Sequence, residues 1–266
     1  MIRPLHIKSM IKSLGLSVAM LTLGSMLALG SADVLAAGGG AKLESPRIDA
    51  GSKKSLQRGA KLFVNYCMAC HSANYQRYNR MARDIGLSEE DVAEQLIFTT
   101  DASGEPTKTG SLMENNMSPE YGRKAFGVIP PNLALTARSR GVDWIYTYLK
   151  SFYKDPSRGA IGVNNTVYPG AAMPHVLWEL QGWQEKVMVD DGHGNQVAKL
   201  ELTSPGSQSP SEYDQTVTDI TNFLAYMSDP IKQTRHRIGT FVLIFLFILL
   251  GIAYMLKKEY WRDVVH

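Results

Sequence analysis

Apolar residues recur at the spacing of an α-helix in four stretches of this 266-residue chain. A serine stands just before each of the first two stretches, at Ser52 and Ser88, and serine side chains often cap the first turn of a helix. We therefore expect both serines to be helix caps. The predicted helices cover residues 55–66, the segment from Ser88 through Ile97, residues 142–153 and residues 213–227.

One short segment has the pattern of a β-hairpin instead. The apolar runs Val187–Val189 and Val197–Leu202 flank residues 190–195, which are polar and contain two glycines, as turns often do. Residues 99–129 and 154–170 are rich in Gly, Pro and Asn and have no apolar periodicity, so we expect long loops there. The sequence predicts an all-α fold with long loops and a small β-hairpin.

Residues 1–37 have the order of a secretory signal peptide. Basic residues come first, an uncharged and mostly apolar run covers 14–29, and Val34-Leu35-Ala36 resembles a cleavage site. An uncleaved N-terminal anchor is the alternative, because the apolar run is long for a signal peptide.

A second apolar run, residues 238–256, lies near the C-terminus and contains 19 residues without a charge. A helix of this length can cross a bilayer. We expect a signal peptide over residues 1–37, an exported body over 38–234, a transmembrane anchor over 235–258 and a tail over 259–266. Export of the body leaves the tail in the cytoplasm.

The charge balance excludes one large class of partners. The chain has 28 Lys and Arg against 25 Asp and Glu, and the basic excess lies at its two ends, beside the apolar runs. Nothing in this distribution indicates nucleic-acid binding. Only two cysteines are present, so disulfides do not staple the fold.

Both cysteines lie in the sequence Cys67-Met68-Ala69-Cys70-His71. Two thiols three residues apart lie on one face of a helical turn, where they can bond the two vinyl groups of one porphyrin. The histidine that follows can then bind the iron. This pattern predicts one covalently bound haem c.

Two other interpretations of the cysteine pair are less favoured. A redox-active disulfide would be expected within a thioredoxin-like pattern of strands and helices, which the sequence lacks. A structural zinc site would need two further ligands at suitable spacing. The remaining histidines are scattered along the chain, at His6, His175, His193, His236 and His266.

The iron of a c-type haem usually has Met or His as its second protein ligand. Met173 is a strong candidate because it lies in a Pro- and Gly-rich loop, which can present one side chain to a flat ring. Met113 and Met117, inside the predicted loop over 99–129, and His175 remain alternatives.

Longer stretches around these residues resemble the cytochrome c1 family. The resemblance extends over nearly all of residues 45–262 and includes several motifs in the family's order. These are Asn65–Ser72 with Tyr75–Arg80, Pro130–Leu133 with Arg138–Gly141, Tyr168–Pro174, and the single C-terminal span.

The resemblance implies the haem subunit of ubiquinol–cytochrome c reductase, beside cytochrome b and the Rieske iron–sulfur protein in a membrane complex that is expected to be dimeric. Electrons would pass from the Rieske protein through the haem to a soluble or tethered cytochrome c. The subunit would not be an enzyme on its own. The signal peptide and short tail suggest a bacterial inner-membrane protein with its haem domain in the periplasm.

The resemblance also implies roles for individual residues. Cys67 and Cys70 would hold the haem, and His71 and Met173 would ligate the iron. The Pro131 carbonyl would accept a hydrogen bond from the His71 ring, and Arg138 would pair with a haem propionate. Relative to mitochondrial members, the chain carries extra residues in Glu185–Ser211.

Three other functions compete with this one. Another membrane-anchored monohaem cytochrome c, of an oxidase or dehydrogenase complex, is disfavoured by the context of Pro130-Pro131 and Arg138. A periplasmic haem enzyme such as a peroxidase would need an open iron position or a second haem motif. A disulfide oxidoreductase would use Cys67 and Cys70 without haem.

Acidic residues follow Met173 closely around the predicted hairpin. They could steer a basic cytochrome to the haem, or they could simply be turn residues on a solvated tip. They are Glu179, Glu185, Asp190, Asp191 and Glu201.

Overall fold

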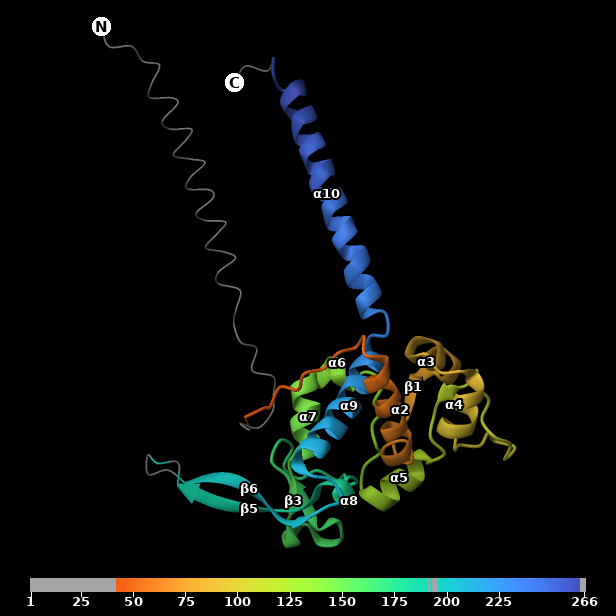
Figure 1. Ribbon diagram of the computed structural model, residues 1–266, viewed down its shortest axis with the longest axis vertical. Coiled ribbons are helices and arrows are strands. Elements are labelled where there is room, and N and C mark those ends of the chain that lie inside the picture. The colour runs from red at the N-terminus through yellow and green to blue at the C-terminus, as the bar shows by residue number, and fades with distance from the viewer. Residues whose placement is uncertain (1–41, 191, 193–195, 264–266) are drawn as a thin grey trace. The chain divides into compact units, whose positions relative to one another are not determined.

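The computed structural model describes residues 42–190, 192 and 196–263. The predicted signal peptide over 1–37 lies outside the described residues, as does much of the predicted turn over 190–195. Helices dominate the described chain, and its strands form three separate two-stranded antiparallel sheets. The predicted all-α class with small hairpins is confirmed (Figure 1).

The helix that leads into the cysteine motif is α2 (Lys53–Tyr66), which confirms the first predicted helix. The Ser52 side chain accepts a hydrogen bond from the Ser55 backbone N–H at 3.4 Å, so the predicted cap is also present. α2 packs closely against α9 (Pro210–Ser228), and the two helices lie side by side in Figure 1.

Glycine at position 59 permits the close approach of α2 and α9. A Cβ atom there would lie 2.2 Å from the Asp219 carbonyl oxygen and 2.7 Å from the Phe223 Cβ. Asp219 is buried, and its carboxylate accepts hydrogen bonds from the Ser55 hydroxyl at 2.6 Å and from Arg58. A buried carboxylate needs such partners, so this cluster fixes the two helices against each other.

The segment after the cysteine motif is more regular than the sequence predicts. It forms strand β1 (Ala73–Arg77), which pairs with β2 (Leu112–Met113), and then helix α3 (Tyr78–Ile85). The predicted cap at Ser88 is confirmed, because its hydroxyl accepts a hydrogen bond from the Asp91 N–H at 3.0 Å. The helix that it caps is α4 (Glu89–Leu96).

The predicted loop over 99–129 is wrong in part, since it contains β2 and helix α5 (Pro119–Phe126). α5 has a Ser118 cap and ends at Gly127, which has a positive φ of 74°. Its interior buries only Gly122, so no apolar stripe revealed it. A further short helix, α6 (Thr136–Arg140), follows.

Helix α7 (Val142–Lys150) is shorter than predicted. It ends where the chain enters strand β3 (Phe152–Lys154), because these residues pair with β4 (Val163–Asn165). The short 3₁₀ helix η1 (Pro156–Ile161) connects the two strands. The predicted loop over 154–170 is therefore wrong for these elements.

The predicted hairpin is confirmed and is longer than expected. Helix α8 (Trp178–Gln181) leads into β5 (Gly182–Asp190), which pairs with β6 (Gln196–Pro205) in antiparallel register. Met188, Val197 and Leu202 are exposed on the hairpin.

One hydrophobic cluster forms the core of the body, and α9 supplies much of it. Its largest fully buried side chains include Tyr78, Phe63, Met81, Met113 and Phe223. Cys67 and Met68 belong to the same cluster, so the cysteine motif is part of the core.

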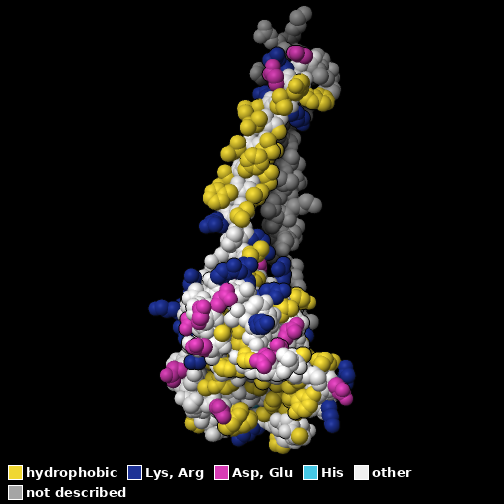
Figure 2. All heavy atoms as spheres, turned by 90° about the vertical axis from the view of Figure 1, so that its right-hand side faces the viewer, with side chains coloured by type: hydrophobic (Ala, Val, Ile, Leu, Met, Phe, Trp, Pro, Cys, Tyr) yellow, Lys and Arg dark blue, Asp and Glu magenta, His cyan; other side chains and the backbone are white. Residues whose placement is uncertain are grey.

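The C-terminal helix α10 (Lys232–Tyr260) confirms the predicted apolar span. It has 29 residues and a mean hydropathy of 2.6 in its most apolar window, and its side chains are exposed. Figure 2 shows hydrophobic side chains along its length. Apolar side chains that are exposed along a helix of this length indicate a membrane anchor.

Candidate haem-binding site

Cys67 ends helix α2, and the chain closes one tight turn between it and His71. The backbone N–H groups of Cys70 and His71 both donate to the Cys67 carbonyl, at 3.1 and 2.9 Å. Both cysteines are free thiols, and the structure forms no disulfide between them. Burial raises the pKa of the Cys67 thiol to about 12 and also raises that of Cys70.

The buried His71 ring is oriented by one backbone group. Its Nδ1 atom lies 2.7 Å from the carbonyl oxygen of Pro131. A carbonyl oxygen can only accept, so Nδ1 carries the proton and the lone pair lies on Nε2. Burial lowers the pKa of His71, although the Pro131 carbonyl opposes this effect. The ring is thus neutral, and its Nε2 atom is available to bind a metal.

Neighbouring elements hold the motif from several sides. The Tyr78 hydroxyl of α3 donates to the Met68 sulfur at 3.3 Å. The backbone N–H of Leu133 donates to the Ser72 carbonyl at 2.9 Å, and the Asn115 N–H donates to the Ser72 hydroxyl at 3.0 Å. The structure therefore brings the segment at Pro131 against the cysteine motif, as the family resemblance implies.

Met173 is half-buried and packs against the hydrophobic cluster that contains Cys67. The Tyr148 hydroxyl donates to its Sδ atom across 3.6 Å. The loop that carries it is held by Arg158, whose Nη2 donates to the carbonyl oxygens of Gly170 and Ala171 at 2.8 and 3.1 Å.

The three alternative ligands lie in different settings. Met113 is fully buried and pairs with Ala73 in the β1–β2 sheet. Met117 is half-buried, and its sulfur would lie 3.5 Å from a Cβ at Gly122.

His175 is buried within an aromatic cluster. Its ring stacks on Phe152 at 5.2 Å and meets the Trp183 ring edge-on at 5.9 Å. Burial lowers its pKa to about 4, so the ring is neutral. Its Nε2 atom has no hydrogen-bond partner among the described residues.

Arg138 is exposed on α6, and its side chain forms no hydrogen bond or ion pair with the described residues. Arg140, two residues further along the chain, makes a cation–π contact, with its guanidinium 5.2 Å from the centre of the Trp144 ring.

The structure also bears on the interpretation of the two cysteines as part of a zinc site. The described part of the chain holds no cluster of three or more His, Cys, Asp or Glu side chains that could bind a zinc ion.

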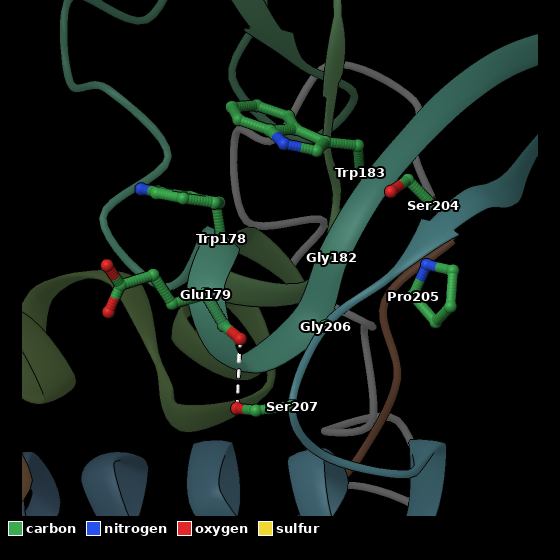
Figure 3. A pocket seen from close by; sticks show the side chains of 8 residues that line it. All are labelled: Trp178, Glu179, Gly182, Trp183, Ser204, Pro205, Gly206 and Ser207. Carbon is green, nitrogen blue, oxygen red and sulfur yellow. Dashed lines mark hydrogen bonds between the residues drawn. The ribbon is translucent and has the colours of Figure 1, made fainter.

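A cavity of about 330 Å³ lies at the base of the hairpin, where Trp178 and Trp183 stack at 5.6 Å. Figure 3 shows Ser207 donating to the Glu179 carbonyl at its edge. Glu179 lines it, but none of the residues predicted to hold the haem does.

Sequence reasoning missed Tyr148, Arg158 and Asn115. Tyr148 belongs to the apolar stripe of its helix, where an aromatic residue is expected to be core. Arg158 and Asn115 lie in segments without periodicity, so no pattern pointed to them.

Known proteins resemble the chain over most of its length. The model of the Cytochrome C1 family matches residues 48–202 and 205–264. Cytochrome c1 of Allochromatium vinosum is 49% identical over 247 residues, which cover 92% of this chain and 98% of that protein. The ammonia monooxygenase gamma subunit of Nitrosomonas europaea is 48% identical over 84% of this chain and 89% of its own length. Cytochrome c1 of Rhodospirillum rubrum is 26% identical over 79% of this chain and 82% of its own length.

Proposed function

The chain belongs to the cytochrome c1 family and is the electron-transfer subunit of a cytochrome bc1 complex, and we propose that it holds one haem c covalently through Cys67 and Cys70. The family implies the haem itself, and the apolar helix α10 anchors the protein in a membrane. Our proposal concerns the number of haems, which is one, and their covalent bonds to the two cysteines.

One observation carries this proposal. Two free thiols lie on a single turn beside His71, whose Nδ1 is bound to the Pro131 carbonyl. That hydrogen bond leaves Nε2 as the atom for a metal, and it orients the ring as backbone carbonyls do for other metal-binding histidines. The donor set of two thiols and one neutral imidazole fits a c-type haem.

Met173 is the second iron ligand in this proposal. Met173 packs against the hydrophobic cluster that contains Cys67, and Arg158 holds the loop that carries it, which supports Met173. Met113 is disfavoured because it fills the core. His175 is disfavoured because its ring is held inside an aromatic cluster, against Phe152 and Trp183.

Arg138 is proposed to pair with a haem propionate. It is a cation without a partner among the described residues, and α6 begins three residues after Leu133, whose N–H holds the Ser72 carbonyl. A charge-assisted hydrogen bond between guanidinium and carboxylate is among the stronger polar contacts in proteins.

When bound, the haem supplies one-electron redox chemistry. The chain's own residues orient the ligands, exclude water from the His71 side and present the acceptor surface. No proton transfer is needed for this task, so we propose that the subunit is not a catalyst by itself.

The proposed setting follows the family. The partners are cytochrome b and the Rieske iron–sulfur protein, in a dimeric complex, with a soluble or tethered cytochrome c as acceptor. We propose a bacterial inner-membrane location, cleavage of a signal peptide over 1–37, a periplasmic body over 38–234, a span over 235–258 and a cytoplasmic tail over 259–266.

Purification from membranes in mild detergent tests this function. We expect cytochrome b and a Rieske protein to accompany the chain, together with quinol–cytochrome c reductase activity. Because a relative carries the name of an ammonia monooxygenase subunit, the preparation should be searched for monooxygenase subunits as well. Isolation with an oxidase, dehydrogenase or monooxygenase, and without cytochrome b, would contradict the proposal.

A further inference from the structure

The Met173 sulfur has a polar neighbour that ligation does not require. The Tyr148 hydroxyl lies 3.6 Å from Sδ and donates a hydrogen bond to it. Sulfur is larger than oxygen and is a weak acceptor, so its hydrogen bonds are longer than those to oxygen. A tyrosine hydroxyl is protonated at neutral pH and is therefore available as a donor.

Aromatic contacts fix the position of the Tyr148 ring. It stacks on Trp144 with a centroid distance of 4.9 Å and an angle of 7°. Phe152 packs against its other side at 5.1 Å and 71°. Trp144 and Tyr148 lie one turn apart on α7, and Phe152 follows in β3, so residues of two elements hold the ring. The hydroxyl cannot swing away from the sulfur without breaking these contacts.

The same residue also anchors the loop through its main chain. The Tyr148 carbonyl accepts a hydrogen bond from the side-chain amide of Asn165, which is fully buried. The side-chain oxygen of Asn165 in turn accepts from the N–H groups of Val167 and Tyr168, at 2.9 and 3.1 Å. The residues that lead into the Met173 loop are therefore hydrogen-bonded, through Asn165, to the backbone of Tyr148.

Resting on the haem ligation proposed above, we propose that Tyr148 is a positioning residue for Met173, which holds the thioether by a hydrogen bond to Sδ and raises the reduction potential of the haem. A thioether sulfur has two lone pairs. If one binds iron, a hydrogen bond to the other withdraws electron density from the sulfur. A poorer donor stabilises the oxidised iron less, and this raises the potential.

Tyr148→Phe in the complete membrane complex tests the proposal, since it removes one oxygen and keeps both ring contacts. We expect covalent haem and a low-spin spectrum to remain, a lower midpoint potential, and a shifted near-infrared band of methionine ligation. The matched control is Tyr121→Phe, at an exposed tyrosine on α5, which should leave both readouts unchanged. A Tyr148→Phe potential and band equal to wild type would overturn the proposal.

A double-mutant cycle separates this inference from the proposed ligand set. In a Met173→Leu background, Tyr148→Phe should no longer shift the potential, because its effect acts through the sulfur. An equal shift in both backgrounds would overturn the proposal. If Met173→Leu itself leaves the potential and spectrum unchanged, the proposed ligand is wrong, and the tyrosine inference fails with it.

A measurement on the unsubstituted protein covers the case in which Tyr148→Phe does not accumulate. The hydroxyl proton exchanges in D₂O, so a hydrogen bond to the ligating sulfur should change the iron–sulfur stretching frequency between H₂O and D₂O. An identical frequency in the two solvents would contradict a hydrogen bond between Tyr148 and the ligating sulfur.

Discussion

His71 and Pro131 are sixty positions apart in the chain, yet the Nδ1 atom of the histidine donates a hydrogen bond to the proline carbonyl at 2.7 Å. The contact fixes the tautomer of the ring and leaves Nε2 for a metal. The proposed haem depends on this orientation as much as on the two thiols.

Met173→Leu should retain the covalent haem and lower the midpoint potential. Loss of a soft axial sulfur removes a ligand that favours reduced iron. Redox titration and the visible spectrum of the purified complex provide the measurement. Met117→Leu is the matched control, at a half-buried methionine on another loop. If the control, rather than Met173→Leu, lowers the potential, Met117 is the ligand.

Arg138→Gln should weaken the seating of the haem without breaking its covalent bonds. A propionate would lose its cation, and because Arg138 is exposed, solvent screening limits the cost to about 1 kcal/mol. The midpoint potential and the thermal stability should both change. Arg123→Gln, at an exposed arginine on α5, should change neither. Identical results for the two variants would argue against the propionate pair.

Gly59→Ala should destabilise the body by about 1–3 kcal/mol, as expected for overpacking of a tight helix contact. The added Cβ would lie 2.2 Å from the Asp219 carbonyl oxygen, which is backbone and cannot move cheaply. Thermal unfolding provides the measurement. Gly110→Ala is the control, because a Cβ there has no neighbour within 4 Å. Equal stability of the two variants would show that α2 and α9 are not packed as described.

Electron transfer to a basic cytochrome should be faster at low salt if the acidic hairpin residues steer it. Glu185 and Glu201 face each other in the β5–β6 register. Each is near a lysine, with Lys154 at 4.0 Å and Lys199 at 3.6 Å, so we expect a modest effect. Replacing both glutamates by Gln should lower the low-salt rate and flatten its dependence on ionic strength. Salt curves that superimpose on those of wild type would remove the hairpin as a steering surface.

Elements with a clear apolar period were predictable from the sequence. The helices at Lys53–Tyr66, Pro210–Ser228 and Lys232–Tyr260 each bury or present a broad apolar face, so their patterns were visible. The helix at Pro119–Phe126 buries only one glycine, and its cap and proline signals were overlooked. The end of α7 was misplaced because Phe152 continues the helical pattern but pairs with β4 instead.

The site residues that lie in one contiguous motif were predictable from the sequence. Cys67, Cys70 and His71 are adjacent in the sequence, and the structure places them on one turn. The contact of Pro131 with His71 was expected only through the family resemblance, because no local pattern encodes a partner sixty residues away. The contact of Tyr148 with Met173 depends on a tertiary approach of α7 to a loop, which periodicity cannot reveal.

Intact mass and haem staining of the denatured chain test the central claim most directly. We predict that the stain migrates with the polypeptide after denaturation and that the mass exceeds that of the polypeptide by one haem. In the double variant Cys67→Ser and Cys70→Ser, the stain should be absent. A wild-type chain that releases all its haem in denaturant, and has the mass of the polypeptide alone, would contradict covalent attachment through Cys67 and Cys70.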